Sequence, residues 1–201
     1  MKKRFVYFLF ICVASLVACS NLVDPAALNL DTANINRLIP FRGELNNGVK
    51  QLYPEEPYKA FWAENWNSPD QSVSWKVNTN GEDYLAEMIV CANNLGEGEE
   101  TELILSNGTD SICCPINSIG WQRCRFPRPL HFDKGTSVLS LKINKPGKKD
   151  DFNVYLYALE VTRPEAYNRL QAEAASLRSN TSWMADLPYG FFFHWNSKSM
   201  P

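Results

Sequence analysis

A succession of short strand-like segments between Ser72 and Val161 is the feature that most constrains the fold of this chain. Apolar and polar residues alternate in the segments, as they do in strands that bury one face. Turn residues separate them, and no convincing helical segment intervenes. The expected strands cover 73–77, 84–90, 101–105, 121–126, 139–143 and 152–161. Strands joined by turns favour antiparallel pairing, so the sequence predicts an all-β fold, an antiparallel β-sandwich.

The composition narrows the classes of partner. The chain has 201 residues, which is room for one domain with tails. Its formal net charge is −2, and we expect no nucleic-acid partner, because phosphate binding requires a surplus of Lys and Arg. Six tryptophans are an excess for this length. Trp75 and Tyr84 lie in alternating strands and are expected in the core.

The N-terminus has the pattern of an export signal. Basic residues 2–4 precede an apolar run over 5–17, which is short for a membrane span. The run ends in Leu-Val-Ala-Cys-Ser, which resembles the bacterial lipobox. The resemblance implies a signal peptide over 1–18, a lipid on Cys19 and a tether over 19–42. It also implies anchoring in the bacterial outer membrane, at the cell surface or facing the periplasm. An ordinary signal peptide that is cleaved nearby is the alternative.

Four further cysteines follow, namely Cys91, Cys113, Cys114 and Cys124. Exported thiols tend to oxidise, but four cysteines allow three pairings, and the sequence does not distinguish a disulfide from buried thiols. Zinc fits poorly, because two of the cysteines are adjacent and no Cys-x-x-Cys or His-bearing pair accompanies them. No metal ligands are therefore predicted.

The order of motifs over residues 58–162 resembles the galactose-binding-like jelly rolls, especially the carbohydrate-binding modules of families 6 and 35. The motifs are a strand bearing Trp75, then Gly81-x-x-Tyr-x-x-x-Met-x-Val, Gly120-Trp-Gln, Leu130-x-x-x-x-Gly with Leu139-x-Leu-x-Ile, and Phe152-Asn-Val-Tyr-x-Tyr-Ala-Leu. The resemblance implies a carbohydrate-binding-like domain over 43–163, with sugar contacts at Trp121 and Asn153. A pyranose stacks its C–H face on a flat ring and bonds its hydroxyls to amides. The alternatives are a core tryptophan and an asparagine that bonds backbone.

Trp62 and Trp66 lie in the polar segment 61–67 and are interpreted as part of a sugar-binding rim, or else as a plug at one end of the sandwich. Calcium is common in modules of this kind as a structural ion. The pairs Asp150-Asp151 and Glu55-Glu56 offer oxygen ligands, but no EF-hand spacing is present.

The C-terminal part changes character. Residues 164–177 are rich in Ala and Glu and begin with Pro, which predicts a helix within a linker over 164–182. The segment 189–195, Tyr-Gly-Phe-Phe-Phe-His-Trp, resembles the first barrel strand of family 29 glycoside hydrolases, the α-L-fucosidases. The resemblance implies that 183–201 begins a truncated (β/α)8 barrel and that His194 and Trp195 contact substrate. Asn196 departs from the family's usual Gly, which puts fucosidase activity in doubt.

These expectations combine into one functional hypothesis. The chain would be the N-terminal part of a lipid-anchored, α-L-fucosidase-like glycoside hydrolase, and its non-catalytic sandwich would bind a glycan, either fucose-containing or another polysaccharide. Glycoside hydrolysis needs two carboxylates, which later barrel strands would supply, so no catalytic residue is assigned. The alternatives are a spacer that docks on the catalytic domain through a stripe around Leu170, and a standalone surface lipoprotein that binds a protein.

Overall fold

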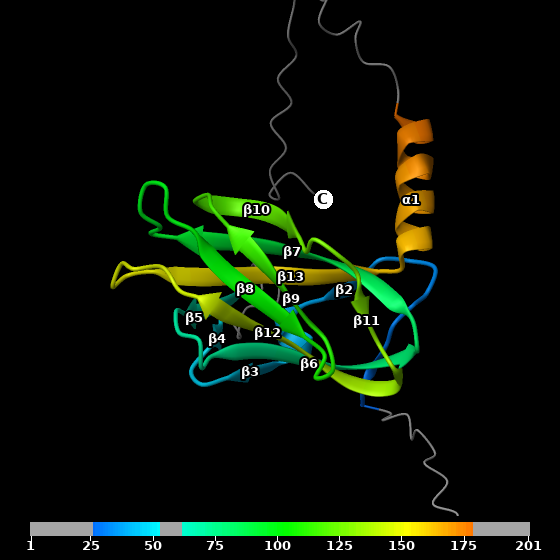
Figure 1. Ribbon diagram of the computed structural model, residues 1–201, viewed down its shortest axis with the longest axis horizontal. Coiled ribbons are helices and arrows are strands. Elements are labelled where there is room, and N and C mark those ends of the chain that lie inside the picture. The colour runs from blue at the N-terminus through cyan, green and yellow to red at the C-terminus, as the bar shows by residue number, and fades with distance from the viewer. Residues whose placement is uncertain (1–25, 53–61, 179–201) are drawn as a thin grey trace, which may run out of the picture.

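The computed structural model describes residues 26–52 and 62–178. They form two facing β-sheets and one helix (Figure 1). The first sheet has six strands. Five follow one another in the order β1 (Leu28–Asn29), β6 (Ser72–Asn80), β12 (Lys134–Lys145), β8 (Thr101–Ser106) and β9 (Ser111–Ile116), and the sixth, β3 (Glu44–Asn46), pairs with β6.

The second sheet has seven strands. Its long strands β7 and β13 pair over nine positions, and β10 is an edge strand. Paired strands are antiparallel in both sheets except for the short β1, which lies parallel to β6. Five of its strands follow one another in the order β10 (Gly120–Arg125), β7 (Asp83–Asn93), β13 (Asn153–Thr162), β5 (Ala63–Trp66) and β4 (Lys50–Gln51). The other two are β11 (Leu130–His131), which pairs with β7, and β2 (Asn36–Leu38), which pairs with β13.

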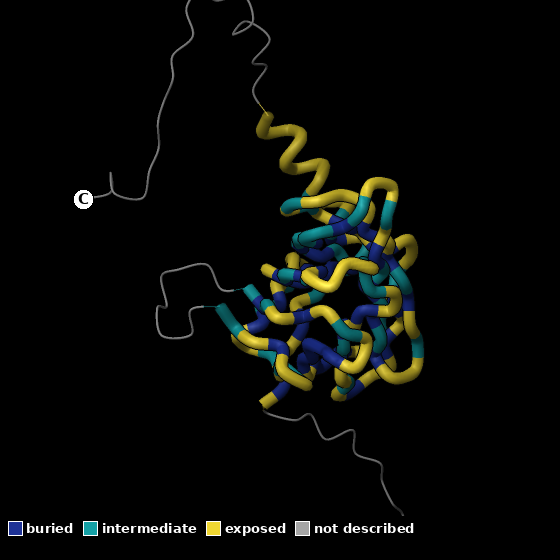
Figure 2. Tube along the Cα trace, turned by 90° about the vertical axis from the view of Figure 1, so that its left-hand side faces the viewer, coloured by how far each residue is buried: buried dark blue, intermediate teal, exposed yellow. Residues whose placement is uncertain are grey.

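The core lies between the two sheets, where the apolar side chains of the long strands are buried (Figure 2). On β7 the buried residues are Tyr84, Ala86, Met88, Val90 and Ala92, and the residues between them are at least partly accessible. Trp75 is buried as well, and its indole Nε1 donates a 2.9 Å hydrogen bond to the backbone oxygen of Ile39. The antiparallel β-sandwich, with Trp75 and Tyr84 in its core, is therefore confirmed.

The six expected strands are all present, and the structure adds β9, which the sequence analysis does not identify. β9 buries Ile112, Cys114 and Ile116 in strict alternation. Pro115 obscures the pattern, since proline cannot donate to a ladder. The strand tolerates it because β9 is the last strand of its sheet.

The N-terminal segment differs from the predicted tether over 19–42. Within its described part, β1 pairs with β6, β2 pairs with β13, and a 3-10 turn, η1 (Pro40–Arg42), follows. Leu30 and Leu38 are buried in the core. These strands are two and three residues long, which is too short for a periodic pattern to be visible in the sequence.

Helix α1 (Pro164–Leu177) has the bounds that the sequence predicts, with proline in its first turn. It projects from the sandwich (Figure 1), and every residue from Gln171 to its end is exposed. Its first turns dock through Tyr167, whose ring lies 4.3 Å from the guanidinium carbon of Arg125. Within the part of the chain that the structure describes, no helix is long and apolar enough to cross a membrane.

Candidate functional site

Three aromatic side chains gather on the outer face of the seven-stranded sheet, and we call them the aromatic cluster: Trp62, Trp121 and Tyr157. The ring centroid of Trp121 lies 5.5 Å from that of Trp62 and 6.4 Å from that of Tyr157. The second contact is edge-to-face, at 83°. Trp121 is 49% exposed and Tyr157 38% exposed, whereas Trp62 is half-buried. The cluster is thus a partly open apolar surface in which tryptophan and tyrosine edges support one another.

The strand register brings these rings together. Trp121 on β10 pairs with Cys91 on β7, which pairs in turn with Tyr155 on β13. Directly paired residues share a face of the sheet, so Trp121 projects from the side opposite the core. A register shift between Leu156 and Ala158 leaves Tyr157 as an extra residue that turns outward.

The glycine before Trp121 has a defined role. Gly120 opens β10 with φ +96°, in the left-handed region that favours glycine. It forms the first pair of the β10–β7 ladder, opposite Ala92, next to the pair that holds Trp121. The backbone conformation that begins this edge strand therefore depends on a residue without a side chain.

The structure corrects the position of Trp66, which the sequence analysis places on a rim with Trp62. Trp66 is fully buried in the core. Simple alternation over 62–66 would put both indoles on one face, but Asn65 has φ +56° and shifts the phase of β5. Trp62 therefore joins the cluster on the outer face, while Trp66 points between the sheets.

Asn153 also has a structural role in the described chain. Its Oδ1 accepts a 2.7 Å hydrogen bond from the backbone N–H of Trp66, which ties β13 to β5. The side chain is half-buried. The structure thus brings Trp121 and Trp62 together, adds Tyr157, and turns Trp66 into the core, while Asn153 bonds the backbone of Trp66.

One polar atom of the aromatic cluster has no acceptor among the described residues. This is the indole Nε1 of Trp62, which is buried. An unpaired buried donor costs free energy.

A charged network borders the aromatic cluster on the same face. Arg123 follows Trp121 by two residues on β10, and its Nη1 donates to Glu160 at 2.7 Å and to Glu87 at 2.6 Å. These two carboxylates are directly paired across β7 and β13, an arrangement that would be repulsive without the bridging arginine. Arg37 donates from the other side to Glu160 at 2.6 Å and 2.8 Å.

The buried member of this network is Glu160, whose side chain is 7% exposed. Burial acts to raise its pKa, but the hydrogen bonds from Arg123 and Arg37 outweigh burial and lower the pKa from the ordinary value of 4.5. The carboxylate therefore stays ionised, and it stabilises the fold at neutral pH. A group with a depressed folded pKa contributes stability that is complete above its unfolded pKa and is lost as the pH falls through the folded value.

We expect Glu160→Gln to lower the free energy of unfolding by about 1 kcal/mol near neutral pH. The difference between wild type and variant should shrink as the pH falls below 4.5, because the wild-type carboxylate then becomes protonated. Urea unfolding at several pH values measures it. Glu97→Gln, in an exposed loop, is the matched control. A difference that stays constant down to about pH 3 would contradict this role.

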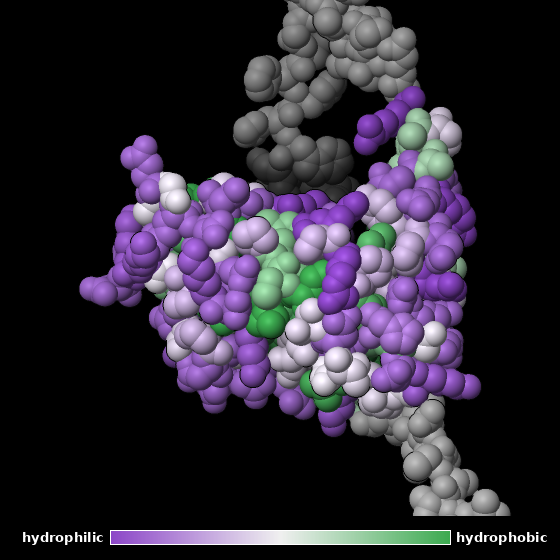
Figure 3. Space-filling model, viewed as in Figure 1, coloured by the Kyte–Doolittle hydropathy of each residue, from purple (hydrophilic) through white to green (hydrophobic). Residues whose placement is uncertain are grey.

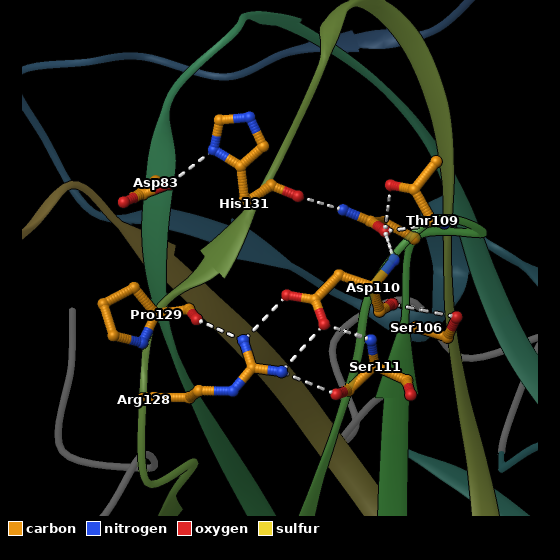
Figure 4. A network of polar contacts seen from close by, with 9 residues as sticks. Asp83, Ser106, Thr109, Asp110, Ser111, Arg128, Pro129 and His131 are labelled. Carbon is orange, nitrogen blue, oxygen red and sulfur yellow. Dashed lines mark hydrogen bonds and ion pairs between the residues drawn. The ribbon is translucent and has the colours of Figure 1, made fainter.

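A second polar network joins the β8–β9 turn to the segment before β12 (Figure 4). Arg128 binds both carboxylate oxygens of Asp110 at 2.7 Å and the backbone oxygen of Ser111 at 2.9 Å. The hydrogen bonds from Arg128 hold the pKa of Asp110 well below its usual range. His131 contacts Asp83 at 2.7 Å, and Asn107 donates to the backbone oxygen of His131. The charged groups are paired within the network, which makes it a loop anchor.

The outer face of the six-stranded sheet also has a shallow hollow, at β8, β9 and β12. Its lining has apolar side chains from Ile104 and Val138, and the rest is largely small or polar. The face in view in Figure 3 is mostly hydrophilic around a small hydrophobic area. No aromatic ring lines the hollow, so it lacks the flat surface on which a sugar stacks.

Several predicted site residues lie outside the described residues, namely Cys19, His194, Trp195 and the Glu55-Glu56 pair. Among the described residues, no group of three or more His, Cys, Asp or Glu side chains is placed to hold a metal ion. Asp150 and Asp151 lie in an exposed turn before β13.

Comparison with known proteins bears on the fold. No protein-family model and no curated protein matches the chain. Among solved structures, the GH26-CBM35 β-(1,4)-mannanase of Podospora anserina is similar over 65% of this chain and 28% of its own, with 7% identity and a TM-score of 0.51. The mosquito-larvicidal Cry4Aa toxin of Bacillus thuringiensis is similar over 69% and 25%, with 12% identity and a TM-score of 0.53.

A third similar structure is the CBM36-1 domain of a multidomain xylanase from the hindgut metagenome of Trinervitermes trinervoides. It is 10% identical, with a TM-score of 0.49 over 64% of this chain and 96% of its own. The alignments with the mannanase and the toxin span about a quarter of those two chains. The TM-scores of the mannanase and the toxin show a shared fold, and at 7% and 12% identity they show the fold alone. Since that fold occurs in both a mannanase and a toxin, function has to be argued from the site.

Proposed function

We propose that the β-sandwich binds carbohydrate on the outer face of its seven-stranded sheet, at the aromatic cluster. One observation carries the proposal, which is that rings from three separate segments meet there while Trp121 stays 49% exposed and Tyr157 38% exposed. Large aromatic side chains are usually mostly buried in a folded domain. A group of exposed rings held in fixed mutual contact is a preformed binding surface.

The chemistry of the cluster suits a sugar. A pyranose presents C–H bonds on one face, and these pack against an indole or phenol ring. Its hydroxyl groups need donors and acceptors nearby. The Tyr157 hydroxyl does both, and Arg123, whose side chain is 53% exposed, lies two residues along the same face from Trp121. An apolar ring surface with polar groups at its border is the arrangement that a shallow carbohydrate site requires.

One of the similar structures supports the proposal. The printed name of the Podospora anserina enzyme includes a carbohydrate-binding module of family 35, and its fold resembles this one. This agrees with the motif order noted above. The argument for sugar binding nevertheless depends on the aromatic cluster, because the toxin shares the fold as well.

A glycan array tests the proposal. The purified protein should bind at least one immobilised oligosaccharide or polysaccharide, with a Kd of roughly micromolar to millimolar, because an open surface with two exposed rings buries little area. The control is the double variant Trp121→Ala/Tyr157→Ala. Fucosylated and unfucosylated glycans should be included as pairs. If no glycan is retained more strongly by the wild type than by the double variant, the proposal is wrong.

We extend the proposal to the setting of this domain. The lipobox-like sequence supports export, lipidation of Cys19 and anchoring in the bacterial outer membrane, and the His194-Trp195 segment supports a family 29-like catalytic domain beginning at residue 183. In the same proposal, the carbohydrate-binding-like domain spans residues 43–163 and the linker spans residues 164–182. Mass spectrometry of the N-terminal peptide tests the lipid. Assay of the protein that carries this sequence against fucosylated substrates tests the catalytic domain.

A further inference from the structure

The four cysteines of the sandwich differ in the direction they face. Cys114 and Cys124 are buried in the core, from β9 and β10. Cys113 is on the opposite side of β9 from Cys114, so it lies on the outer face of the six-stranded sheet. Cys91 lies on the outer face of the seven-stranded sheet, paired in register with Trp121. Two cysteines on opposite outer faces cannot pair with each other, nor with thiols in the core, without disrupting the strands.

The two buried thiols lie in the same part of the core. The Sγ of Cys114 donates a 3.4 Å hydrogen bond to the backbone oxygen of Arg125, the residue that follows Cys124. Both cysteines are free thiols in the structure. β9 is the last strand of one sheet and β10 the last strand of the other, and the two strands contact each other.

We infer that Cys114 and Cys124 form an intramolecular disulfide that joins the edge strands of the two sheets. Of the six possible bonds between two of the four cysteines, this is the one that joins two core-facing side chains. Backbone ladders hold each sheet together, but they do not cross from one sheet to the other at this edge. A covalent link between β9 and β10 would close the sandwich on the side where both sheets end.

The bond forms by exchange with a disulfide oxidant, such as oxidised glutathione. The thiolate of one of the two cysteines attacks one glutathione sulfur, and the other glutathione leaves as a thiolate that takes up a proton. The thiolate of the second cysteine then attacks the cysteine sulfur of the mixed disulfide and releases the second glutathione. The two cysteines lose two electrons and two protons, and the oxidant gains both.

Both sulfurs are buried, so exchange takes place during folding or when the edge strands open. Export, as the N-terminal sequence predicts, would bring the chain into an oxidising environment. The inference does not depend on glycan binding.

Peptide mapping of the purified protein tests the inference. The protein is refolded with oxidised and reduced glutathione, its free thiols are alkylated, and it is digested with trypsin and a Glu-specific protease. We expect the segment 103–123 to be linked to the dipeptide 124–125, with Cys91 and Cys113 alkylated. Reduction should lower the melting temperature by about 5–10 °C, because the bond closes a short loop.

Matched variants assign the link to a single pair. Cys113→Ala should retain it and Cys114→Ala should lose it, although these cysteines are adjacent in the sequence. If Cys114→Ala does not fold, fragmentation of the wild-type linked peptide between residues 113 and 114 decides the same question. Alkylation of both Cys114 and Cys124 after refolding, or a link from Cys124 to Cys113, would overturn the inference.

Discussion

Replacing Trp121 with alanine is expected to weaken glycan binding at least about tenfold, which is equivalent to about 1.4 kcal/mol. Trp121 is at the centre of the aromatic cluster, since it contacts both Trp62 and Tyr157. The change removes its own stacking surface and also leaves the other two rings without the side chain that fixes them. Central aromatic anchors of this kind contribute most of the binding energy of an interface.

The fold should survive this change. Trp121 is 49% exposed, and its loss removes two ring contacts that are worth about 0.5–1.5 kcal/mol each. Titration calorimetry with the best ligand from the array measures affinity, and urea unfolding measures stability. Phe41→Ala is the control, because Phe41 is a 64% exposed aromatic residue that belongs to none of the ring contacts of the cluster. Unchanged affinity in Trp121→Ala would move the binding site away from the cluster.

Tyr157 separates stacking from hydrogen bonding in the same surface. Tyr157→Phe keeps the ring that meets Trp121 edge-on and removes only the hydroxyl. A loss in this variant would indicate that a sugar hydroxyl bonds to the phenol, and retained binding would indicate that the ring itself is what the ligand contacts.

The long strands of the fold could be predicted because apolar residues recur at every second position in them, and that period is visible in the sequence. β7 shows it most clearly, with Tyr84 to Ala92 inward at every second position. β1 and β2 could not be predicted, since strands of two or three residues do not show a period. Their place in the sheets depends on pairing with β6 and β13, residues far away in the sequence.

The candidate site was predictable in part, and the limit has a definite cause. Trp121 follows a glycine turn, and both features are visible in the sequence. Tyr157 and Trp66 lie next to irregular positions, the register shift in β13 and the positive φ of Asn65. At such positions one residue reverses which face the following side chains occupy. A repeat-based prediction therefore assigns Trp66 to the wrong side, whereas Tyr157 still follows the alternation of Asn153 and Tyr155, and the period is lost after it.

Trp66→Ala tests this placement, because an indole in the core and an indole on a binding rim have opposite consequences. We expect the variant to lose about 3–5 kcal/mol of unfolding free energy, as truncation of a buried tryptophan does. That is a large part of the 5–15 kcal/mol that usually stabilises a domain. Trp62→Ala, four residues away, should cost about 1 kcal/mol, because Trp62 is only half-buried.

Trp66→Phe keeps the experiment decisive if the alanine variant does not fold. The phenyl ring fills much of the same space and gives up the weak 3.4 Å hydrogen bond from Nε1 to the backbone oxygen of Gln71, so a loss of about 1–2 kcal/mol is expected. Glycan affinity per folded molecule should remain unchanged in this variant. It should fall in Trp62→Ala, because that change removes one of the three rings of the aromatic cluster. If Trp66→Phe instead lowered affinity without lowering stability, Trp66 would belong to the rim. The phase shift at Asn65 would then no longer explain the division between Trp62 and Trp66.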